Sequence, residues 1–481
     1  MNASRKGISA AIVIFILICR VAPVFGFDLQ YPLFDDPLFS KPDVIEKGVI
    51  LPGDTAPIAC LVSKDFSSPL TLSEAVDIAL CNNPQIRSSW ANIRVRAAAV
   101  GEARAAYLPA LNGALNRTKD RIDYSDSRYP DSDIYRTTFQ GGLSWRILDF
   151  GGRGANRRAA NALLAAALAS HNATLQKALS DVAQAYFDAM TAKAALKAAI
   201  EGKEIAQATL NSAKAREEKG AISRSDRLRA TTALASAILE SNRAQSDYRK
   251  ALAVLGQILG VPGNTVISIP EDLAENAGKI SKDLNDWLEE AQRNHPAIVA
   301  AREQLKAAQN QVAVVRSAGL PTLNFSANYY KNTKPGEAVT QTEATETTVG
   351  IGVNIPLFDG FSNTYKIRGA QAQVEQKKAA LADTENSIAL DLIKAYVDAT
   401  SALKNIDASA DLLKAAQEAL AVSQRRYDKG AADITEILNT QSALSGARHE
   451  RIRCLAEWHS ARLRLLASAG KMGRLAATGE K

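Results

Sequence analysis

Apolar residues recur along this chain at two spacings, and the spacing changes in a fixed order. From Leu72 to Ala106 they recur every three or four residues, which predicts an amphipathic helix. From Leu111 they alternate with polar positions such as Asn112, as in a strand with two unlike faces. A return strand, residues 139–147, alternates more cleanly. The pattern therefore predicts a helix followed by a β-hairpin.

The same order occurs twice, because the chain contains an internal duplication. Asn-Asn-Pro ending at Pro84 recurs as Asn-His-Pro ending at Pro296, 212 residues later. Residues 185–189 (Ala-Tyr-Phe-Asp-Ala) recur as residues 395–399 (Ala-Tyr-Val-Asp-Ala), 210 residues later. The offset changes once, and length changes concentrate in loops. Each half is therefore expected to fold in the same way.

The second half contains its own predicted hairpin, with strands from Leu323 to Tyr329 and from Val349 to Leu357. Both strands alternate between an apolar side and a side of polar residues and glycine. Strands of about ten residues with this pattern are typical of a barrel that faces lipid outside and water inside. The alternative is an amphipathic hairpin on a soluble core, which would need a second apolar layer to cover it.

A long helix-favouring run follows each hairpin, from Arg157 to Glu218 and from Tyr365 to Asp428. Both runs are rich in alanine, leucine, glutamine and lysine and contain no proline. At about 1.5 Å per residue, each would extend on the order of 90 Å. Helices of this length do not belong to a compact domain, so the sequence predicts a coiled-coil assembly.

Shorter helices are predicted to return after turns at Gly220 and Gly430. The returning helix from Ser225 to Leu259 and the earlier helix from Leu72 to Ala106, placed end to end, would match one long helix. The expected product is a parallel-sided helical wall.

The chain begins with a segment typical of a secretory signal peptide, expected to span residues 1–26. Arg5 and Lys6 precede an apolar stretch, and Arg20 interrupts it before it reaches the roughly 20 residues that span a bilayer. Cys19 does not follow a small residue, so no lipid anchor is expected. No later stretch predicts a transmembrane helix, so a membrane-integral protein would have to be a barrel.

Composition and charge exclude one class of partner. The 481 residues are 46% hydrophobic and 23% charged, as expected for a folded chain. The net charge of +7 comes from lysines and arginines dispersed among acids rather than clustered. We therefore expect no nucleic-acid partner.

Four strands are too few to close a barrel, since about eight is the smallest number that does so. Open strand edges are not tolerated in lipid, so the chain must combine its strands with copies of itself. The predicted fold class is a mixed α/β membrane protein. Three copies would give a trimeric 12-stranded β-barrel, with 4 strands per chain, continuous with a long α-helical barrel and built on an internal two-fold repeat.

The duplication, the Leu-Phe-Asp-Gly turn at residues 357–360 and the paired Arg-x-x-x-Gly helix tips resemble the family of TolC-like outer-membrane efflux proteins. The resemblance extends from Leu70 to Gly470. It implies a homotrimer among outer-membrane lipid, with the helical part in the periplasm. It also implies two partners, a periplasmic adaptor protein and an inner-membrane ABC or proton-driven transporter that supplies the energy.

Five segments are expected from this reading of the chain. They are a signal peptide (1–26), an N-terminal extended segment (27–69), a first helix-hairpin-helix repeat (70–270), a second repeat (271–470) and a flexible C-terminal tail (471–481).

The resemblance also assigns a periplasmic gate. Tyr427, one turn before a helix tip, would hydrogen-bond Asp226 of the first half and hold the entrance shut; a conformational change can break such a bond. Glu436 and Asn439 occupy the positions of the family's aspartate ring. Because the second is an amide, the ring would hold three carboxylates, which favour cations in a pore. The alternative for Glu436 is an ordinary solvated helix residue.

Four further residues, Arg216, Gly220, Arg426 and Gly430, are expected at helix tips that contact the adaptor. A purely structural role is equally open for the two glycines, because glycine permits the left-handed turn between antiparallel helices.

Cys60 and Cys81 are spaced to close a short loop, so a disulfide is expected in an oxidising periplasm. Two unpaired buried thiols are the alternative.

No catalytic site, cofactor or metal is expected. None of the histidines pairs with a cysteine or carboxylate at metal-ligand spacing; they are His171, His295, His449 and His459. Residues 151–154 (Gly-Gly-Arg-Gly) lack the Lys-Ser/Thr ending of a phosphate loop and are interpreted as a strand-to-helix turn.

The predicted function is a passive outer-membrane channel-tunnel of a tripartite export system, not an enzyme. The missing lipid anchor and the paired cysteines near residues 79–84 are similar to ducts that serve type I protein secretion; drug or metal efflux is the alternative. A structural coiled-coil or adhesin-like surface protein is the alternative of another class. The two barrel-like hairpins would have no purpose there.

Overall fold

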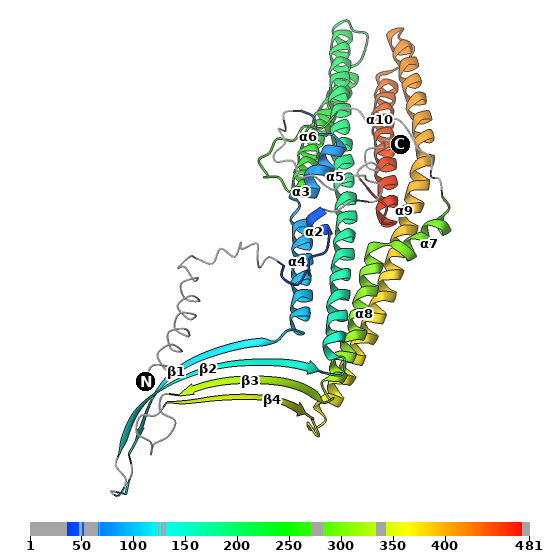
Figure 1. The fold of residues 1–481 in the computed structure, drawn as a ribbon. Coiled ribbons are helices and arrows are strands. Elements are labelled where there is room, and N and C mark those ends of the chain that lie inside the picture. Colours follow the sequence, from blue (N-terminus) through cyan, green and yellow to red (C-terminus); the bar gives the residue numbers. More distant parts are fainter. Residues whose placement is uncertain are drawn as a thin grey trace.

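The computed structural model describes residues 36–47, 51, 66, 68–123, 125–126, 128, 131–270, 280, 282–332 and 343–473. Long helices project from one end of a curved β-sheet (Figure 1). The predicted signal peptide and most of the predicted N-terminal segment and tail lie outside the described residues.

The sheet contains four antiparallel strands in the order β1-β2-β3-β4. Their bounds are β1 Ala110–Ile122, β2 Ser132–Leu148, β3 Thr322–Asn332 and β4 Ala344–Asn354. The two predicted hairpins therefore lie side by side, with Trp145 of β2 opposite Phe325 of β3. The ladder is irregular between Arg146 and Leu148, where β2 approaches its end.

The helices occupy the predicted places around these hairpins, with a short helix α2 at Val44–Lys47. The first half has α3 Leu72–Asn82, α4 Pro84–Ala105, α5 Gly152–Glu218 and α6 Arg224–Leu259. The second half has α7 Leu284–Asn294, α8 Pro296–Ser317, α9 Ser362–Asp428 and α10 Ile434–Ser468. The long helices α5 and α9 have 67 residues each, which confirms the two long runs. No helix among the described residues combines the length and the apolar character needed to cross a membrane.

The single helix predicted from Leu72 to Ala106 is wrong in one respect, because the structure divides it at Asn83. Asn83 has an extended backbone (φ −62°, ψ 122°), and its side chain caps α4 by accepting a hydrogen bond from the Gln85 amide at 2.8 Å. Pro84 takes the first helical position, where its missing N–H costs nothing. The helical spacing of apolar residues continues across this break, so periodicity alone does not reveal it.

The repeated Asn-x-Pro motif marks the place where two short helices meet end to end. Gly260 ends α6 with φ +70°, and a Cβ there would lie 2.7 Å from the Asn82 carbonyl oxygen. Gly470 follows α10 with φ +72°, and a Cβ there would lie 2.7 Å from Pro296. Glycine is needed at both joins for its backbone conformation and for its lack of a side chain. The end-to-end arrangement predicted for the first half is confirmed, and the second half repeats it.

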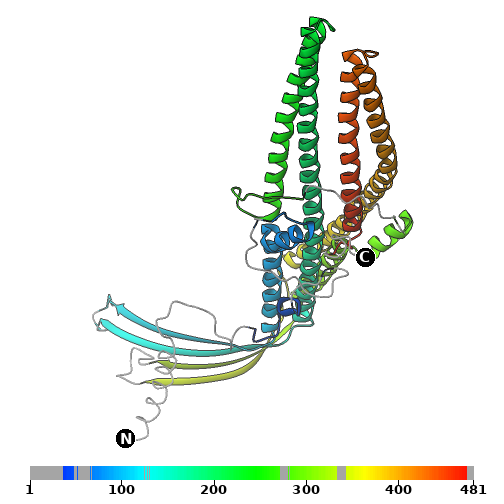
Figure 2. The same ribbon diagram turned by 90° about the horizontal axis from the view of Figure 1, so that it is seen from above.

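The helices form one layer in which α5, α8 and α10 lie inside. One free side is formed by α4 and α6 and the other by α9. α5 packs against α4, α6, α8 and α10, and α9 packs against α8 and α10. Figure 2 shows the hairpins α5–α6 and α9–α10 projecting to the same end. Alanine dominates the buried positions of α5 and α9, so the helices approach closely. The larger buried side chains, such as Tyr186 and Trp458, lie where α3 or α7 covers the layer.

Candidate functional site

The sheet has one apolar and one polar face, and both are uncovered in the single chain. Leu111, Val349 and Ile351 are 78%, 64% and 68% exposed, respectively. The opposite face carries polar side chains and glycines, such as Asn328 opposite Gly142. A soluble chain rarely leaves so many large apolar side chains uncovered on one surface. No helix of the described chain supplies the second apolar layer that an amphipathic hairpin on a soluble core would need.

The two free sides of the helical layer also expose large apolar side chains. All large hydrophobic side chains exposed on described helices, apart from Ile200, belong to α4, α6 or α9. On α4 and α6 they are Val95, Leu228, Ile238, Leu239 and Val254. On α9 they are Tyr365, Leu390, Ile393, Val397, Leu412 and Val422. The inner helices α8 and α10 carry none, so the unpartnered surface lies at the two sides where another chain would pack.

The predicted tip glycines form the turns between antiparallel helices. Gly220 has φ +71° and Gly430 has φ +72°, and a Cβ at either position would meet no atom within 4 Å. The backbone conformation alone therefore favours glycine at these tips. Their surfaces remain open to contact by another protein.

Tyr427 and Arg216 connect the two hairpin tips. The Arg216 guanidinium lies 4.1 Å from the Tyr427 ring centre, and its Nη1 donates to the Tyr427 carbonyl at 3.0 Å. Arg216 Nη2 also lies 3.7 Å from an Asp428 carboxylate oxygen. Arg216, predicted to contact an adaptor, is therefore held by the neighbouring hairpin of its own chain.

The predicted hydrogen bond from Tyr427 to Asp226 is not formed in this structure. The Asp226 carboxylate instead accepts from the Ser223 amide at 3.2 Å and from its hydroxyl at 2.8 Å, which caps the start of α6. Tyr427 is 3% exposed, and its hydroxyl has no hydrogen-bond partner among the described residues. Burial raises the pKa of Tyr427, and the nearby Asp226 charge adds to the rise while Arg216 opposes it.

Glu436 lies at the start of α10 and is paired within its own hairpin. Its carboxylate accepts from Arg426 Nη1 at 2.8 Å and from the Ser423 hydroxyl at 3.0 Å. The predicted acidic group is thus offset by an adjacent cation, and Arg426 is directed to Glu436. Asn439 is exposed and lines an open hollow on the same helix face as Glu436, beside the turn at Gly430.

Three polar contacts between the hairpins were not anticipated. Arg229 donates to Thr435 at 2.9 Å, Gln441 donates to Thr209 at 2.9 Å, and Arg448 pairs with Glu201 at 2.8 Å. With Arg216 they join the first hairpin to the second in the part of the layer toward the tips. Each joins residues more than 200 positions apart, so no local pattern signals them.

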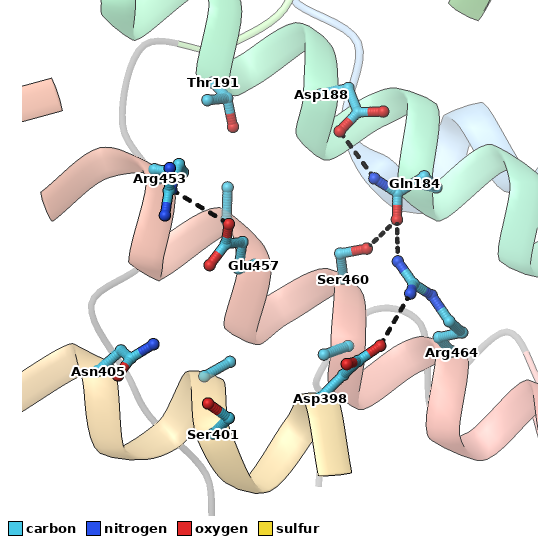
Figure 3. A pocket seen from close by; sticks show the side chains of 13 residues that line it. Gln184, Asp188, Thr191, Asp398, Ser401, Asn405, Arg453, Glu457, Ser460 and Arg464 are labelled. Carbon is cyan, nitrogen blue, oxygen red and sulfur yellow. Dashed lines mark hydrogen bonds and ion pairs between the residues drawn. The ribbon is translucent and has the colours of Figure 1, made fainter. Parts of the chain in front are cut away.

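A polar cavity of about 480 Å³ lies where α5, α9 and α10 meet (Figure 3). Arg464 of α10 donates to Gln184 at 2.7 Å and to Asp398 at 3.3 Å, and so bridges α5 and α9. Gln184 in turn donates to Asp188 at 2.7 Å. Burial raises the pKa of Asp188. Asp188 and Asp398 are equivalent positions of the repeat, which brings both aspartates to one cavity.

The strand-to-helix turn at residues 151–154 is stabilised by Arg153. Its guanidinium pairs with Asp149 at 3.2 Å, donates to the carbonyls of Arg146 and Ile147, and lies 4.9 Å from the Tyr107 ring. Gly151 has φ +92° and caps α5. This segment joins β2 to the long helix α5, which agrees with its interpretation as a strand-to-helix turn.

Cys81 is disulfide-bonded, and Cys454 is free and buried. The predicted partner Cys60 lies outside the described residues, so that pairing stays a prediction. Among the described residues, no three histidine, cysteine, aspartate or glutamate side chains converge to hold a metal. Burial lowers the pKa of His171 and of His295 to about 4, so both rings are neutral at pH 7.

Comparison with known proteins adds four findings. The family model "Outer membrane efflux protein" matches residues 75–261 and 287–471, one match for each half of the duplication. Protein CyaE of Bordetella pertussis is 35% identical over 432 residues, covering 89% of this chain and 90% of that protein. The proteases secretion protein PrtF of Dickeya chrysanthemi is 22% identical over 229 residues, 48% of each chain. The outer-membrane channel OprN has the same fold, with a TM-score of 0.73 and 18% identity over 90% of this chain and 99% of that one.

Proposed function

This chain belongs to the outer membrane efflux protein family, and we propose that three copies of it form one export duct. The protein is a channel of the outer membrane, with its helices in the periplasm. The duct is passive, because cargo moves through it on energy spent elsewhere.

The trimer is supported by the open edges of the sheet together with the uncovered apolar side chains on the sheet and on the outer helices. β1 and β4 each leave one edge unpaired in the described sheet, and lipid does not tolerate open strand edges. About eight strands are the fewest that close, so four per chain require several chains, and three supply twelve. When the barrel closes, the exposed apolar side chains on α4 and α6 of one chain would pack against those on α9 of the next chain.

The partners are a periplasmic adaptor and an inner-membrane transporter, either ABC or proton-driven. The open turns at Gly220 and Gly430 offer a surface for the adaptor at the end of the helices remote from the membrane. We favour protein cargo of the type I secretion kind, because PrtF, a related chain, is named for protease secretion. Efflux of small molecules is the second candidate, which the family's name favours.

We place the periplasmic gate at the hairpin tips. Arg216 would hold the second hairpin inward through Tyr427 and Asp428, and Asp226 would add its charge beside the Tyr427 ring. Glu436 and Asn439 would face the entrance, where the pairing of Glu436 with Arg426 weakens a negative ring.

Single-channel recording tests the proposed function. The purified full-length protein, reconstituted in planar phosphatidylcholine bilayers, should give discrete ion-conducting steps, and its mass in detergent should correspond to three chains. Correctly folded protein that stays monomeric and soluble without detergent, or that never conducts, would refute the channel.

A further inference from the structure

The sheet carries basic side chains directly beyond its apolar band, at the end remote from the helices. On β1 the apolar face that includes Leu111 and Leu115 continues as Arg117 and Lys119. Side chains at alternate positions of a strand share one face of the sheet. The face that meets lipid therefore changes from apolar to basic within two residues.

Arg117 and Lys119 gather around a single tyrosine. The Tyr135 ring centre lies 5.7 Å from Arg117 Cζ and 5.4 Å from Lys119 Nζ. Lys119 Nζ also lies 2.8 Å from Asp133, and both side chains of that pair are about half exposed, at 48% and 50%. Arg117 forms no ion pair with a described residue. We call the cluster of Arg117, Lys119 and Tyr135 the basic rim. Together with Asp133 it contains two cations and one carboxylate, so its net charge is positive.

The other basic side chains at this level have their own acids. Arg121 pairs with Asp123 at 3.1 Å, and Lys331 pairs with Glu343 at 3.0 Å. On the opposite face of the same hairpin, Arg136 lies 3.5 Å from Asp120. The uncompensated charge is therefore on the lipid side of β1.

The height of the basic rim matches a layer of lipid headgroups. On β2 the apolar band runs from Ile147 to Phe139, about 26 Å along the strand and about 20 Å in height for a barrel tilt of about 40°. In the strand register Arg117 lies opposite Thr137, which on the same estimate is about 5 Å beyond Phe139 in height. Tyr329 meets Phe139 edge to face, with ring centres 6.2 Å apart, as in an aromatic girdle at a membrane interface.

We propose that the basic rim binds phosphate groups of anionic lipids in the outer leaflet. This inference rests on the proposed function, which places the hairpin end outside the cell. The Arg117 guanidinium is a fork of N–H donors that fits two phosphate oxygens. Exposed ion pairs contribute little to stability, so the Lys119 ammonium can exchange Asp133 for phosphate.

The test titrates the purified full-length oligomer with lipid A, a glucosamine disaccharide with acyl chains and two phosphates, and counts bound lipid by native mass spectrometry. Arg117→Gln with Lys119→Gln should bind it about 30-fold more weakly, because each basic residue at an anionic surface contributes a factor of about five. Lipid A stripped of phosphate should bind the unchanged protein as weakly. The charge-conserving pair Arg117→Lys with Lys119→Arg should retain most of the affinity.

Arg136→Gln is the matched control, since it removes one cation from the other face of the same hairpin. Its affinity for lipid A should stay within about twofold of the unchanged protein. Equal binding by the double glutamine variant, equal loss in the control, or full displacement by inorganic phosphate would each overturn the inference. Conductance in phosphatidylcholine bilayers distinguishes failure of the lipid-binding proposal from failure of the channel function. If the variants conduct normally but bind lipid A as the unchanged protein does, the lipid-binding proposal is refuted and the channel function is not.

Discussion

A lysine on either side of β4 provides a stringent test of the channel wall. Ile351 and Gly350 are neighbours on one strand, so their side chains point to opposite faces of the sheet. Ile351 is 68% exposed in the single chain and lies inside the apolar band, opposite Phe325, which in turn lies opposite Trp145. A Cβ at Gly350 would meet no atom within 4 Å, so a lysine fits there without displacing a neighbour.

The expected costs differ by the environment of the charge. A lysine at the bilayer midplane costs about 2–4 kcal/mol per chain, or about 6–12 kcal/mol for three chains. Ile351→Lys should therefore lower the folding equilibrium roughly 30- to 1,000-fold per chain. Gly350→Lys leaves its ammonium in water and should change stability little, while three new cations in the lumen shift ion selectivity toward anions.

Urea unfolding in phosphatidylcholine vesicles, followed by tryptophan fluorescence, measures the first effect. Trp145 lies in β2 on the apolar face and reports on the sheet. Reversal potentials in a salt gradient measure the second effect. If Gly350→Lys is as unstable as Ile351→Lys, or if Ile351→Lys unfolds like the unchanged protein, the assignment of the two faces is wrong.

Three further predictions concern the helices. Arg216→Ala removes the ring contact, the hydrogen bond and the ion pair between the hairpin tips, so it should raise single-channel conductance. Tyr427→Phe should leave conductance unchanged, because the Tyr427 hydroxyl has no hydrogen-bond partner among the described residues. Equal currents in the unchanged protein and both variants would contradict the gate. Burial lowers the pKa of His171 to about 4, whereas its value in the unfolded chain is about 6.5. The folded state is therefore not penalised by this histidine above pH 6.5, and the free energy of unfolding falls as the pH drops from 6.5 toward 4. About 2 kcal/mol should be missing at pH 5, and His171→Gln should lose fewer degrees of melting temperature between pH 7 and pH 5 than the unchanged protein. Gly260→Ala should lower the urea midpoint more than Gly220→Ala does. Both glycines have positive φ, which costs an alanine about 1–2 kcal/mol, but only at Gly260 would the added Cβ also meet a backbone carbonyl. Equal midpoints would refute the tight join.

The elements of this protein could be read from the sequence because their signals are local. Period-two segments became β1 to β4, and proline-free alanine-rich runs became α5 and α9, with helix starts within a few residues of those expected. The duplication predicted that both halves share one element order, which the structure confirms. The split at Asn83 was missed because the capped, extended residue between α3 and α4 leaves the apolar spacing on both sides intact.

The contacts at the candidate site depended on the local structure of each hairpin tip and on the placement of the two hairpins. The family resemblance implies a bond from Tyr427 to Asp226, but the Ser223 cap takes that carboxylate and Arg216 covers the ring. Glu436 was interpreted as a lumen charge, yet Arg426 lies within 2.8 Å of it. No spacing rule distinguishes these outcomes, because each charged group has several partners of suitable chemistry within reach.

The sequence by itself therefore determined the strands, the long helices, the repeat and the apolar surfaces that require copies of the chain. These follow from side-chain periodicity along a regular backbone, which neighbouring residues set. Only the tertiary structure decided which cation meets which acid at the tips, and how equivalent aspartates of the repeat, Asp188 and Asp398, come to one cavity. The pairing of Arg216 with Asp428 and the meeting of the two aspartates depend on the packing of helices more than 200 residues apart in the chain, where small alanine side chains set the approach. Arg426 instead meets Glu436 across the turn of a single hairpin.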